Sequence, residues 1–248
     1  MPILDTETIH SSFTNDSDWK KEAYLQFAQR LSDKKHKFPC IPATIGFQLR
    51  HFRYAYVSDP RSEQTAKELA EALKVYGVQS RSFGKYTSLI VFFHTPAEVA
   101  DQYSVEEYRS LFWRLLDQAS GLDESEWPAH IPQDPNHHVW EYCFGGEQYF
   151  MYCATPAHRL RQSRYFPYFV FAVTPRWVLQ EFNAQPERAE EIKRSIRERT
   201  AKYDDIGIHP DLNLYGSEDN FEWKQYFLGD DDVPAAGCPF AHLHKPNG

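Results

Sequence analysis

The sequence predicts a single α+β domain, with an antiparallel or mixed β-sheet and helices packed mainly on one side. Two observations favour this class. Helix and strand patterns alternate over the first half of the chain, and several strand patterns then follow one another directly. Two of these, HVWEYCF and QYFMYCAT, are separated by a Gly-Gly-Glu turn, which is typical of an antiparallel hairpin. We expect a flexible segment over residues 1–15, the domain over 16–240 and a loose tail over 241–248.

Helical periodicity of the apolar residues defines four helices. The second is expected to end at Gly77, since glycine is common just after a helix. The third opens with Ser104 and Glu107, which are spaced as a capping box. The fourth is strongly charged, with opposite charges recurring four positions apart. The four helices are expected over residues 19–35, 62–77, 104–120 and 187–204.

Strand patterns occupy much of the remaining sequence. Alternation or continuous runs of apolar and β-branched residues mark each strand, and proline-rich loops separate some of them. Pro39 and Pro42 are expected to break the chain between the first helix and the first strand. The strands are expected over residues 51–57, 86–93, 138–144, 148–155 and 165–175.

Composition excludes several classes of protein. The formal net charge is −8 and no basic stripe for binding phosphates is visible, which argues against a nucleic-acid partner. The longest apolar run, SLIVFF, has the length of a strand and is too short to span a membrane. The start has no apolar export signal, and the four cysteines have no CxxC spacing. These features predict a soluble cytoplasmic protein with reduced thiols.

The aromatic content is unusually high, with 18 Phe, 15 Tyr and 6 Trp residues. Such an excess suits a large apolar pocket for a planar ligand, and it equally suits a core built from rings. No GxGxxG or Walker loop follows a predicted strand, so no bound nucleotide cofactor is predicted.

The densest polar segment is CATPAHRLRQSR, at residues 153–164. It contains His158 among Arg159, Arg161 and Arg164. Neighbouring guanidinium groups oppose protonation of an imidazole, and a neutral imidazole is the form that binds a metal. The arginines could pair with carboxylates, such as haem propionates or an acidic group of a substrate. The alternative is an exposed loop that forms ordinary salt bridges.

Two cysteines lie in proline-containing loops, Cys40 in FPC and Cys238 in GCPF. The residue before a proline avoids the helical region, so the Cys238-Pro step turns the chain away after the sulfur and leaves the thiolate accessible to an iron. The alternative is that both are plain loop cysteines. Cys238 with His242 and His244 also has the composition of a bare metal site, but its spacing matches no common zinc pattern.

Several segments together resemble the YqcI/YcgG family, and more specifically its YcgG branch. The resemblance extends from about Trp19 to Phe240. The segments that carry it are FPC (38–40), YTSLIVFF (86–93), HHVWEYCFGGEQYF (137–150), TPAHRLRQSR (155–164), PRWVLQEF (175–182), EDNFEWKQYFL (218–228) and CPF (238–240).

The resemblance implies a haem-dependent N-oxygenase, because some members hydroxylate the nitrogen of arginine-like guanidines. It implies haem b, with His158 as the first candidate for the iron ligand and Cys238 or Cys40 as the alternatives. A guanidinium substrate would need carboxylates and an aromatic face. The candidates for these contacts are Glu141, Glu222 and Trp140. The further residues that the resemblance carries over include Arg161, Arg164 and Glu147, expected to act in catalysis, and Arg161, Arg164 and Arg176, expected to hold the haem.

The expected partners are a small-molecule substrate and a separate electron donor or a peroxide, since no flavin or nicotinamide fingerprint is present. A homodimer is an option, and no nucleic acid or membrane is expected. Two alternatives to the enzyme stay open: a non-enzymatic haem-binding or haem-sensing protein, and a non-haem metal protein that uses the C-terminal Cys/His cluster.

Overall fold

The computed structural model describes residues 3–13, 18–212 and 220–242. A five-stranded sheet of order β1-β2-β5-β4-β3 forms its centre. Strand β1 is parallel to β2, whereas all other neighbours are antiparallel, so the sheet is mixed as expected. The strands are β1 (Arg53–Val57), β2 (Leu89–Phe93), β3 (Tyr142–Phe144), β4 (Glu147–Ala154) and β5 (Val170–Pro175).

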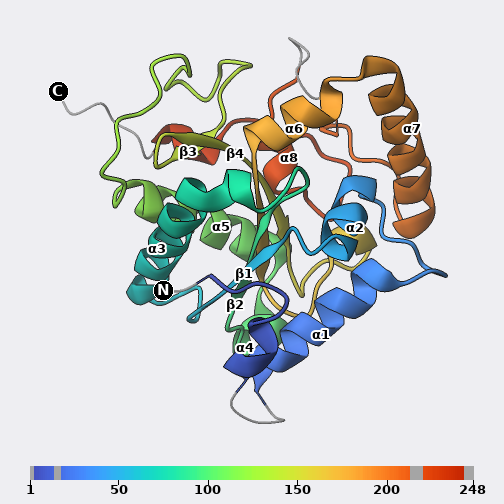
Figure 1. The fold of residues 1–248 in the computed structure, drawn as a ribbon, viewed down its shortest axis with the longest axis horizontal. Helices are drawn as coiled ribbons and strands as arrows, with labels where there is room; N and C mark the ends of the chain where they lie inside the picture. The colour runs from blue at the N-terminus through green and yellow to red at the C-terminus, as the bar shows by residue number, and fades with distance from the viewer. Residues whose placement is uncertain (1–2, 14–17, 213–219, 243–248) are drawn as a thin grey trace.

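The helices surround this sheet in Figure 1. The α-helices are α1 (Trp19–Ser32), α2 (Ile41–Gln48), α3 (Glu63–Gln79), α4 (Ala97–Gln102), α5 (Val105–Ser120), α6 (Arg176–Asn183), α7 (Pro186–Tyr203) and α8 (Trp223–Tyr226). Short 3-10 turns occur at η1 (Ile9–Ser12), η2 (Ser80–Ser82), η3 (Gln162–Arg164) and η4 (Pro239–His242).

Helices cover both faces of the sheet. One core packs α3, α5 and α8 on one face, and a second core packs α1 and α2 on the other (Figure 1). Strand β2 shows why: Leu89 and Val91 belong to the first core, and Ile90 and Phe92 to the second. A strand with apolar side chains in both directions must be buried on both sides. The α+β class is confirmed, and the expected one-sided arrangement of the helices is corrected.

Most predicted elements are present. The capping box of Ser104 and Glu107 starts α5, and the β3–β4 hairpin turns through Gly145 and Gly146, both with positive φ. Helix α3 does not end at Gly77 but continues to Gln79. The chain does not simply break at Pro42, because proline fits the first turn of a helix and α2 begins there.

The ends of the described chain are attached to the body. Leu4 pairs with Tyr54 of β1, and Ile9 is fully buried in the second core, although both lie in the segment expected to be flexible. At the other end, Cys238 and Phe240 are buried in the first core. No helix within the described ranges is long and apolar enough to cross a membrane.

Gly46 fixes α2 close to the loop before β2. A Cβ atom at this position would lie 2.5 Å from the backbone oxygen of Tyr86 and 2.8 Å from the ring of Phe52. We expect Gly46→Ala to lower the free energy of unfolding by about 1–3 kcal/mol, because α2 must move away from the sheet. Urea denaturation measures this loss. Gly121→Ala is the control, since its nearest atom would lie at 3.6 Å, and an equal loss in both variants would contradict the expectation.

Candidate functional site

A cavity of about 400 Å³ lies on the sheet face that carries Ile90, Tyr152 and Ala172. Helices α1, α2, α6 and α7 contribute the opposite walls, together with the loop before α2. The volume is in the range of pockets that bind small molecules and cofactors. Most of its wall is apolar, including the rings of Phe27, Phe38, Phe52, Phe150, Phe166 and Phe182.

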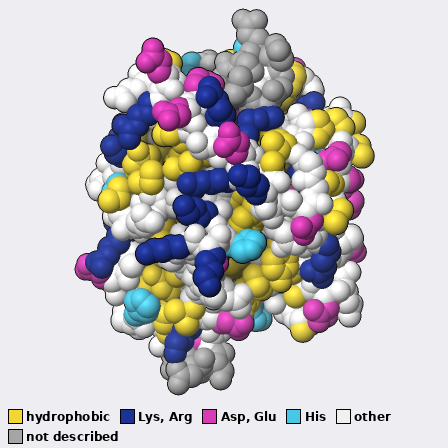
Figure 2. Space-filling model, turned by 90° about the vertical axis from the view of Figure 1, so that its right-hand side faces the viewer, with side chains coloured by type: hydrophobic (Ala, Val, Ile, Leu, Met, Phe, Trp, Pro, Cys, Tyr) yellow, Lys and Arg dark blue, Asp and Glu magenta, His cyan; other side chains and the backbone are white. Residues whose placement is uncertain are grey.

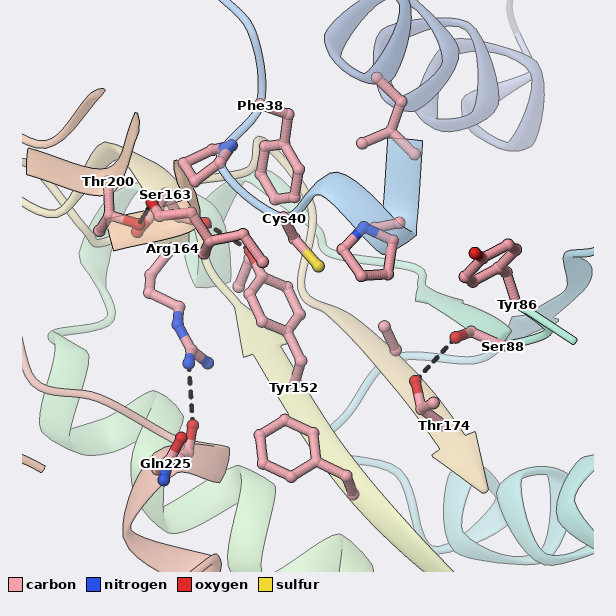
Figure 3. Close-up of a pocket in the computed structure, with 18 of the residues that line it drawn as sticks. Phe38, Cys40, Tyr86, Ser88, Tyr152, Ser163, Arg164, Thr174, Thr200 and Gln225 are labelled. Carbon is pink, nitrogen blue, oxygen red and sulfur yellow. Dashed lines mark hydrogen bonds between the residues drawn. The ribbon is translucent and has the colours of Figure 1, made fainter. Parts of the chain in front are cut away.

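Cys40 lies in this wall, and its sulfur points into the cavity (Figure 3). It is the N-cap residue of α2, a position where backbone N–H groups and the helix dipole favour a negative charge. Burial raises the pKa of the Cys40 thiol, whereas the backbone N–H of Ala43 and the charge of Arg164 oppose this rise. Burial is the larger effect, so the loop and helix present Cys40 to the cavity with a raised pKa, and the other two contacts offset only part of that rise.

The charged groups of the cavity wall are all cationic. Arg30, Arg164, Lys193 and Arg197 line it, and no Asp or Glu among the described residues does so. The guanidinium of Arg164 lies 4.4 Å from the ring centre of Tyr152 and donates hydrogen bonds to the carbonyl of Gln225 at 2.8 Å and that of Tyr226 at 3.0 Å. A cavity of this charge favours a ligand with acidic groups.

Two groups of polar side chains lie at opposite ends of the view in Figure 3. Arg164, Ser163 and Thr200 are at one end, whereas Tyr86, Ser88 and Thr174 are at the other. The hydroxyls of Ser88 and Thr174 are 2.7 Å apart and hydrogen-bonded to each other. This pair provides both a donor and an acceptor at the end of the cavity away from the cations.

His158 does not line the cavity. It is buried, and both of its ring nitrogens have partners: Nδ1 lies 2.8 Å from the hydroxyl of Thr155, and Nε2 lies 3.0 Å from the carbonyl oxygen of Leu228. A carbonyl only accepts, so Nε2 carries the proton and Nδ1 accepts from Thr155. This neutral imidazole ties the end of β4 to residue 228 and keeps no nitrogen directed at the cavity.

The His158 site makes the stability of the fold depend on pH. Burial lowers the pKa of His158 to about 4, so the folded state disfavours the charged form that the unfolded chain takes up below about pH 6.5. The stability that neutral His158 contributes is therefore fully present above about pH 6.5, the pKa of histidine in the unfolded chain, and is lost as the pH falls toward 4. We expect protonation of His158 in the unfolded chain to lower the free energy of unfolding by about 2 kcal/mol between about pH 7 and about pH 5.

Urea unfolding at these two pH values checks this expectation, with His158→Gln as the comparison. The variant lacks the titrating group, so its loss of stability on acidification should be smaller than that of the wild type by about the same 2 kcal/mol. His51 and His209 also have lowered pKa values, but they are present in both proteins and cancel in the difference. Equal losses in the two proteins would contradict the expectation.

Arg161 is completely buried and also lies outside the cavity wall. Its backbone N–H and those of Arg159 and Leu160 donate to the carboxylate of Asp230. The segment expected to hold haem propionates is thus fastened to a neighbouring loop. The guanidinium donates to the carbonyl oxygens of Gly207, Gly229 and Asp231 and to the carboxylate of Asp232, and it lies 3.7 Å from the carboxylate of Asp204.

Cys238 lies on the opposite face of the sheet from Cys40. It is buried in the first core beside Phe240, whose ring centre is 5.5 Å from that of Trp140. Trp140 is fully buried in the same core. Cys40 instead packs against the second core, across the sheet. The two thiols therefore cannot reach the same bound group.

The predicted carboxylates lie near the β3–β4 end of the sheet, outside the cavity wall. Glu141 is buried and pairs with Arg176 at the start of α6. Glu222 is buried and accepts a hydrogen bond of 2.6 Å from Asn220, which itself accepts one of 2.9 Å from Gln225, a cavity residue. Glu147 pairs with Phe144 across the hairpin.

The bare-metal hypothesis finds no support within residues 3–13, 18–212 and 220–242, where no group of three His, Cys, Asp or Glu residues is placed to hold an ion. His244 lies outside the described residues, and the side chain of His242 is not described either. The cluster with Cys238 therefore stays untested.

Two of the candidates named from the sequence, Cys40 and Arg164, lie in the cavity wall. Sequence reasoning missed the hydroxyls of Ser88 and Thr174 and the cations of α7. The alternation of side chains in β5 and the helical spacing of Lys193 and Arg197 carried a signal for these positions. These patterns identify cavity residues only when the fold shows which face of the sheet and of α7 borders the cavity.

Fold and cavity together define an α+β protein with an apolar, cation-lined pocket into which a cysteine points. The chain belongs to the YqcI/YcgG family, whose profile matches residues 27–241. It is 48% identical over 225 residues to "Uncharacterized protein YqcI" of Bacillus subtilis (strain 168), which covers 91% of this chain and 89% of the relative. It is 47% identical over 226 residues to "Uncharacterized protein YcgG" of the same organism, with the same coverage.

A more distant relative has a name that describes an activity. The chain is 29% identical over 228 residues to "Putative N(omega)-hydroxy-L-arginine synthase DcsA" of Streptomyces lavendulae, which covers 90% of this chain and 84% of the relative. No solved structure matches the chain.

Proposed function

We propose that the protein is a haem-dependent N-oxygenase that hydroxylates a nitrogen of an arginine-like guanidine or amine, with Cys40 as the ligand of the haem iron. One observation carries the proposal: of the three candidate ligands, Cys40 has its sulfur in the large apolar cavity, whereas His158 and Cys238 are enclosed elsewhere. The name of the relative from Streptomyces lavendulae supports the choice of reaction.

The cavity fits a haem in three respects. Its aromatic and aliphatic walls suit a flat apolar ring, Cys40 supplies a sulfur ligand, and the cations suit two acidic side groups. Arg30, Arg164, Lys193 and Arg197 are the residues that would hold these groups, in place of the Arg161 and Arg176 expected from the sequence. Arg164 is the best placed, because its backbone contacts fix it rigidly beside Tyr152.

When bound, a thiolate-ligated haem supplies activation of O2 for oxygen insertion. The protein would contribute the sulfur of Cys40, held at the start of α2, and a largely apolar wall around the reacting groups. The Ser88–Thr174 hydroxyl pair can hold a water or a polar substrate group and pass a proton along its hydrogen bond. These are the roles that the geometry of the chain allows.

For the substrate, the cavity offers a different chemistry from the one expected. Glu141, Glu222 and Trp140 do not form its wall, so direct pairing of a guanidinium with them requires the substrate to extend past Gln225. Gln225 is connected to Glu222 through Asn220, and this network is the route by which a cationic group could meet a carboxylate. Gln225→Leu is the variant that tests it.

The test is product formation by protein reconstituted with haem. Arginine is supplied with O2 and an electron-donating system, or with hydrogen peroxide, and N-hydroxylated product is detected by mass spectrometry. Formation of this product with the haem-loaded protein and its absence with the apoprotein are expected. Stoichiometric haem without product from arginine or simple guanidines would favour the haem-binding or haem-sensing alternative. Absence of a Soret band would reject both.

A further inference from the structure

A strongly basic surface lies beside the cavity. We define it as residues 34–37 together with five cations of α7, namely Lys193, Arg194, Arg197, Arg199 and Lys202. These two stretches contain eight Lys and Arg residues and one acidic residue, Glu198, although the whole chain has a net charge of −8. One of the eight, Lys193, forms an ion pair of 2.9 Å with Glu190 in the preceding turn of α7. Figure 2 shows Lys and Arg side chains gathered across the middle of this face. Positive charge is therefore concentrated here against the balance of the protein.

Ring contacts hold the two halves of the basic surface together. The ring centre of Tyr203, at the end of α7, lies 6.2 Å from that of His36 and 6.0 Å from that of Phe38. The guanidinium of Arg30 lies over both Phe38 and Tyr203. Residues 34–37 are exposed, and the ring contacts of His36 and Phe38 with Tyr203 place this loop beside the end of α7. Such a surface can select a partner by its position as well as by its charge.

The basic surface is also the outer side of the cavity wall. Residues 34–37 lead directly into Phe38, Pro39 and Cys40, which line the cavity, and Lys193 and Arg197 line it from α7. A partner bound here would be separated from Cys40 by little more than the Phe38 loop. The rings of His36, Tyr203 and Phe38 form a continuous aromatic path from the surface to the cavity wall.

We propose that this basic surface docks an acidic electron-carrier protein that delivers electrons to the cavity. The inference rests on the proposed function. Insertion of one oxygen atom of O2 into an N–H bond, with reduction of the other to water, consumes two electrons and two protons: R–NH2 + O2 + 2e− + 2H+ gives R–NHOH + H2O. A small acidic iron–sulfur or flavin protein supplies these electrons one at a time and complements the surface in charge.

A nucleic acid is the competing polyanion, and the charge distribution disfavours it. The basic surface covers one patch, whereas the remaining surface of the chain is strongly acidic and would repel an extended backbone. A compact acidic protein can bind through the basic surface alone and does not meet the acidic remainder.

The experiment compares two charge-reversal variants of the haem-loaded protein. Lys34→Glu/Lys35→Glu changes the exposed loop, outside the cavity wall. Lys67→Glu/Lys74→Glu makes the same change of charge on α3, which packs on the opposite face of the sheet. Hydroxylation of arginine is driven either by reduced plant-type [2Fe–2S] ferredoxin with its reductase, or by hydrogen peroxide.

We expect the loop variant to need about tenfold more ferredoxin for half-maximal rate at low salt, and the α3 variant to resemble the wild type. Peroxide-driven turnover should be equal in all three proteins, because it needs no carrier. Added salt should weaken the ferredoxin dependence of the wild type in the same way. Equal ferredoxin dependence in both variants would overturn the docking proposal while leaving the N-oxygenase intact.

Two further outcomes count against the proposal. If the wild type forms no product either with reduced ferredoxin or with hydrogen peroxide, the proposed function is rejected and the docking proposal is rejected with it. Binding of duplex DNA, of anionic phospholipid vesicles and of oxidised ferredoxin to the wild type is also compared. If DNA or vesicles bind more tightly than ferredoxin, and the loop variant loses this binding, the basic surface belongs to that polyanion instead.

Discussion

Replacement of Cys40 by alanine is expected to lower haem content by more than about tenfold and to abolish the Soret signature of a thiolate ligand. The reason is geometric: Cys40 is the candidate ligand whose sulfur points into the cavity from the start of α2. The measurement is the absorption spectrum of reconstituted protein, in the ferric state and as the ferrous carbon-monoxide complex. The side chain is only partly buried, so the fold should survive the change.

Three companion variants make this result specific. Cys40→His keeps a ligand at the same place and should move the spectrum to that of a histidine-ligated haem. Cys238→Ser and His158→Gln should leave the spectrum unchanged, because both side chains are enclosed away from the cavity. A Cys40→Ala protein with the wild-type spectrum and full haem content would refute ligation by Cys40, and a changed spectrum in one of the other variants would identify the true ligand.

Local sequence rules predicted the regular elements well where a single signal dominates. Ser104 and Glu107 define the start of α5 by their own hydrogen bonds, and Gly145 and Gly146 form the hairpin turn because they adopt positive φ. Such signals act within a few residues and need no knowledge of the fold. Gly77 is not the end of α3, which continues to Gln79; a Cβ atom there would lie only 2.7 Å from the hydroxyl of Tyr149, so a close tertiary contact accounts for this glycine.

The layer arrangement and the site needed information that is not local. The five apolar residues of β2 indicated burial on both faces, but which helices cover each face depends on how distant segments cross. Cys40 and Cys238 were both candidate ligands in the sequence, where the Cys-Pro step favoured Cys238. The sheet separates them, because α2 and η4 pack on opposite faces. His158 looked like a ligand until its two hydrogen-bond partners were known.

Replacement of Arg161 by alanine is expected to lower the free energy of unfolding by about 3–5 kcal/mol without changing the Soret band of the haem-loaded protein. Removing the guanidinium takes the donor away from the carbonyl oxygens of Gly207, Gly229 and Asp231, of which the Gly229 bond is buried. It also takes the ion-pair partner, 3.7 Å away, from the buried carboxylate of Asp204. Burial already raises the pKa of Asp204. Loss of the nearby positive charge should raise that pKa further.

Urea denaturation of five variants separates this structural role from a catalytic one. Arg159→Ala is the matched control, because the guanidinium of Arg159 donates to the carbonyl oxygen of the nearby Pro156, and its loss should cost less than about 1 kcal/mol. Arg161→Lys should recover only part of the loss, since an ammonium cannot reproduce the planar set of donors. Asp204→Asn, combined with Arg161→Ala, should cost less than the sum of the two single changes, because the uncompensated charge is then absent. If Arg161→Ala instead kept full stability and lost haem or activity, Arg161 would belong to the functional site, as the sequence alone had indicated.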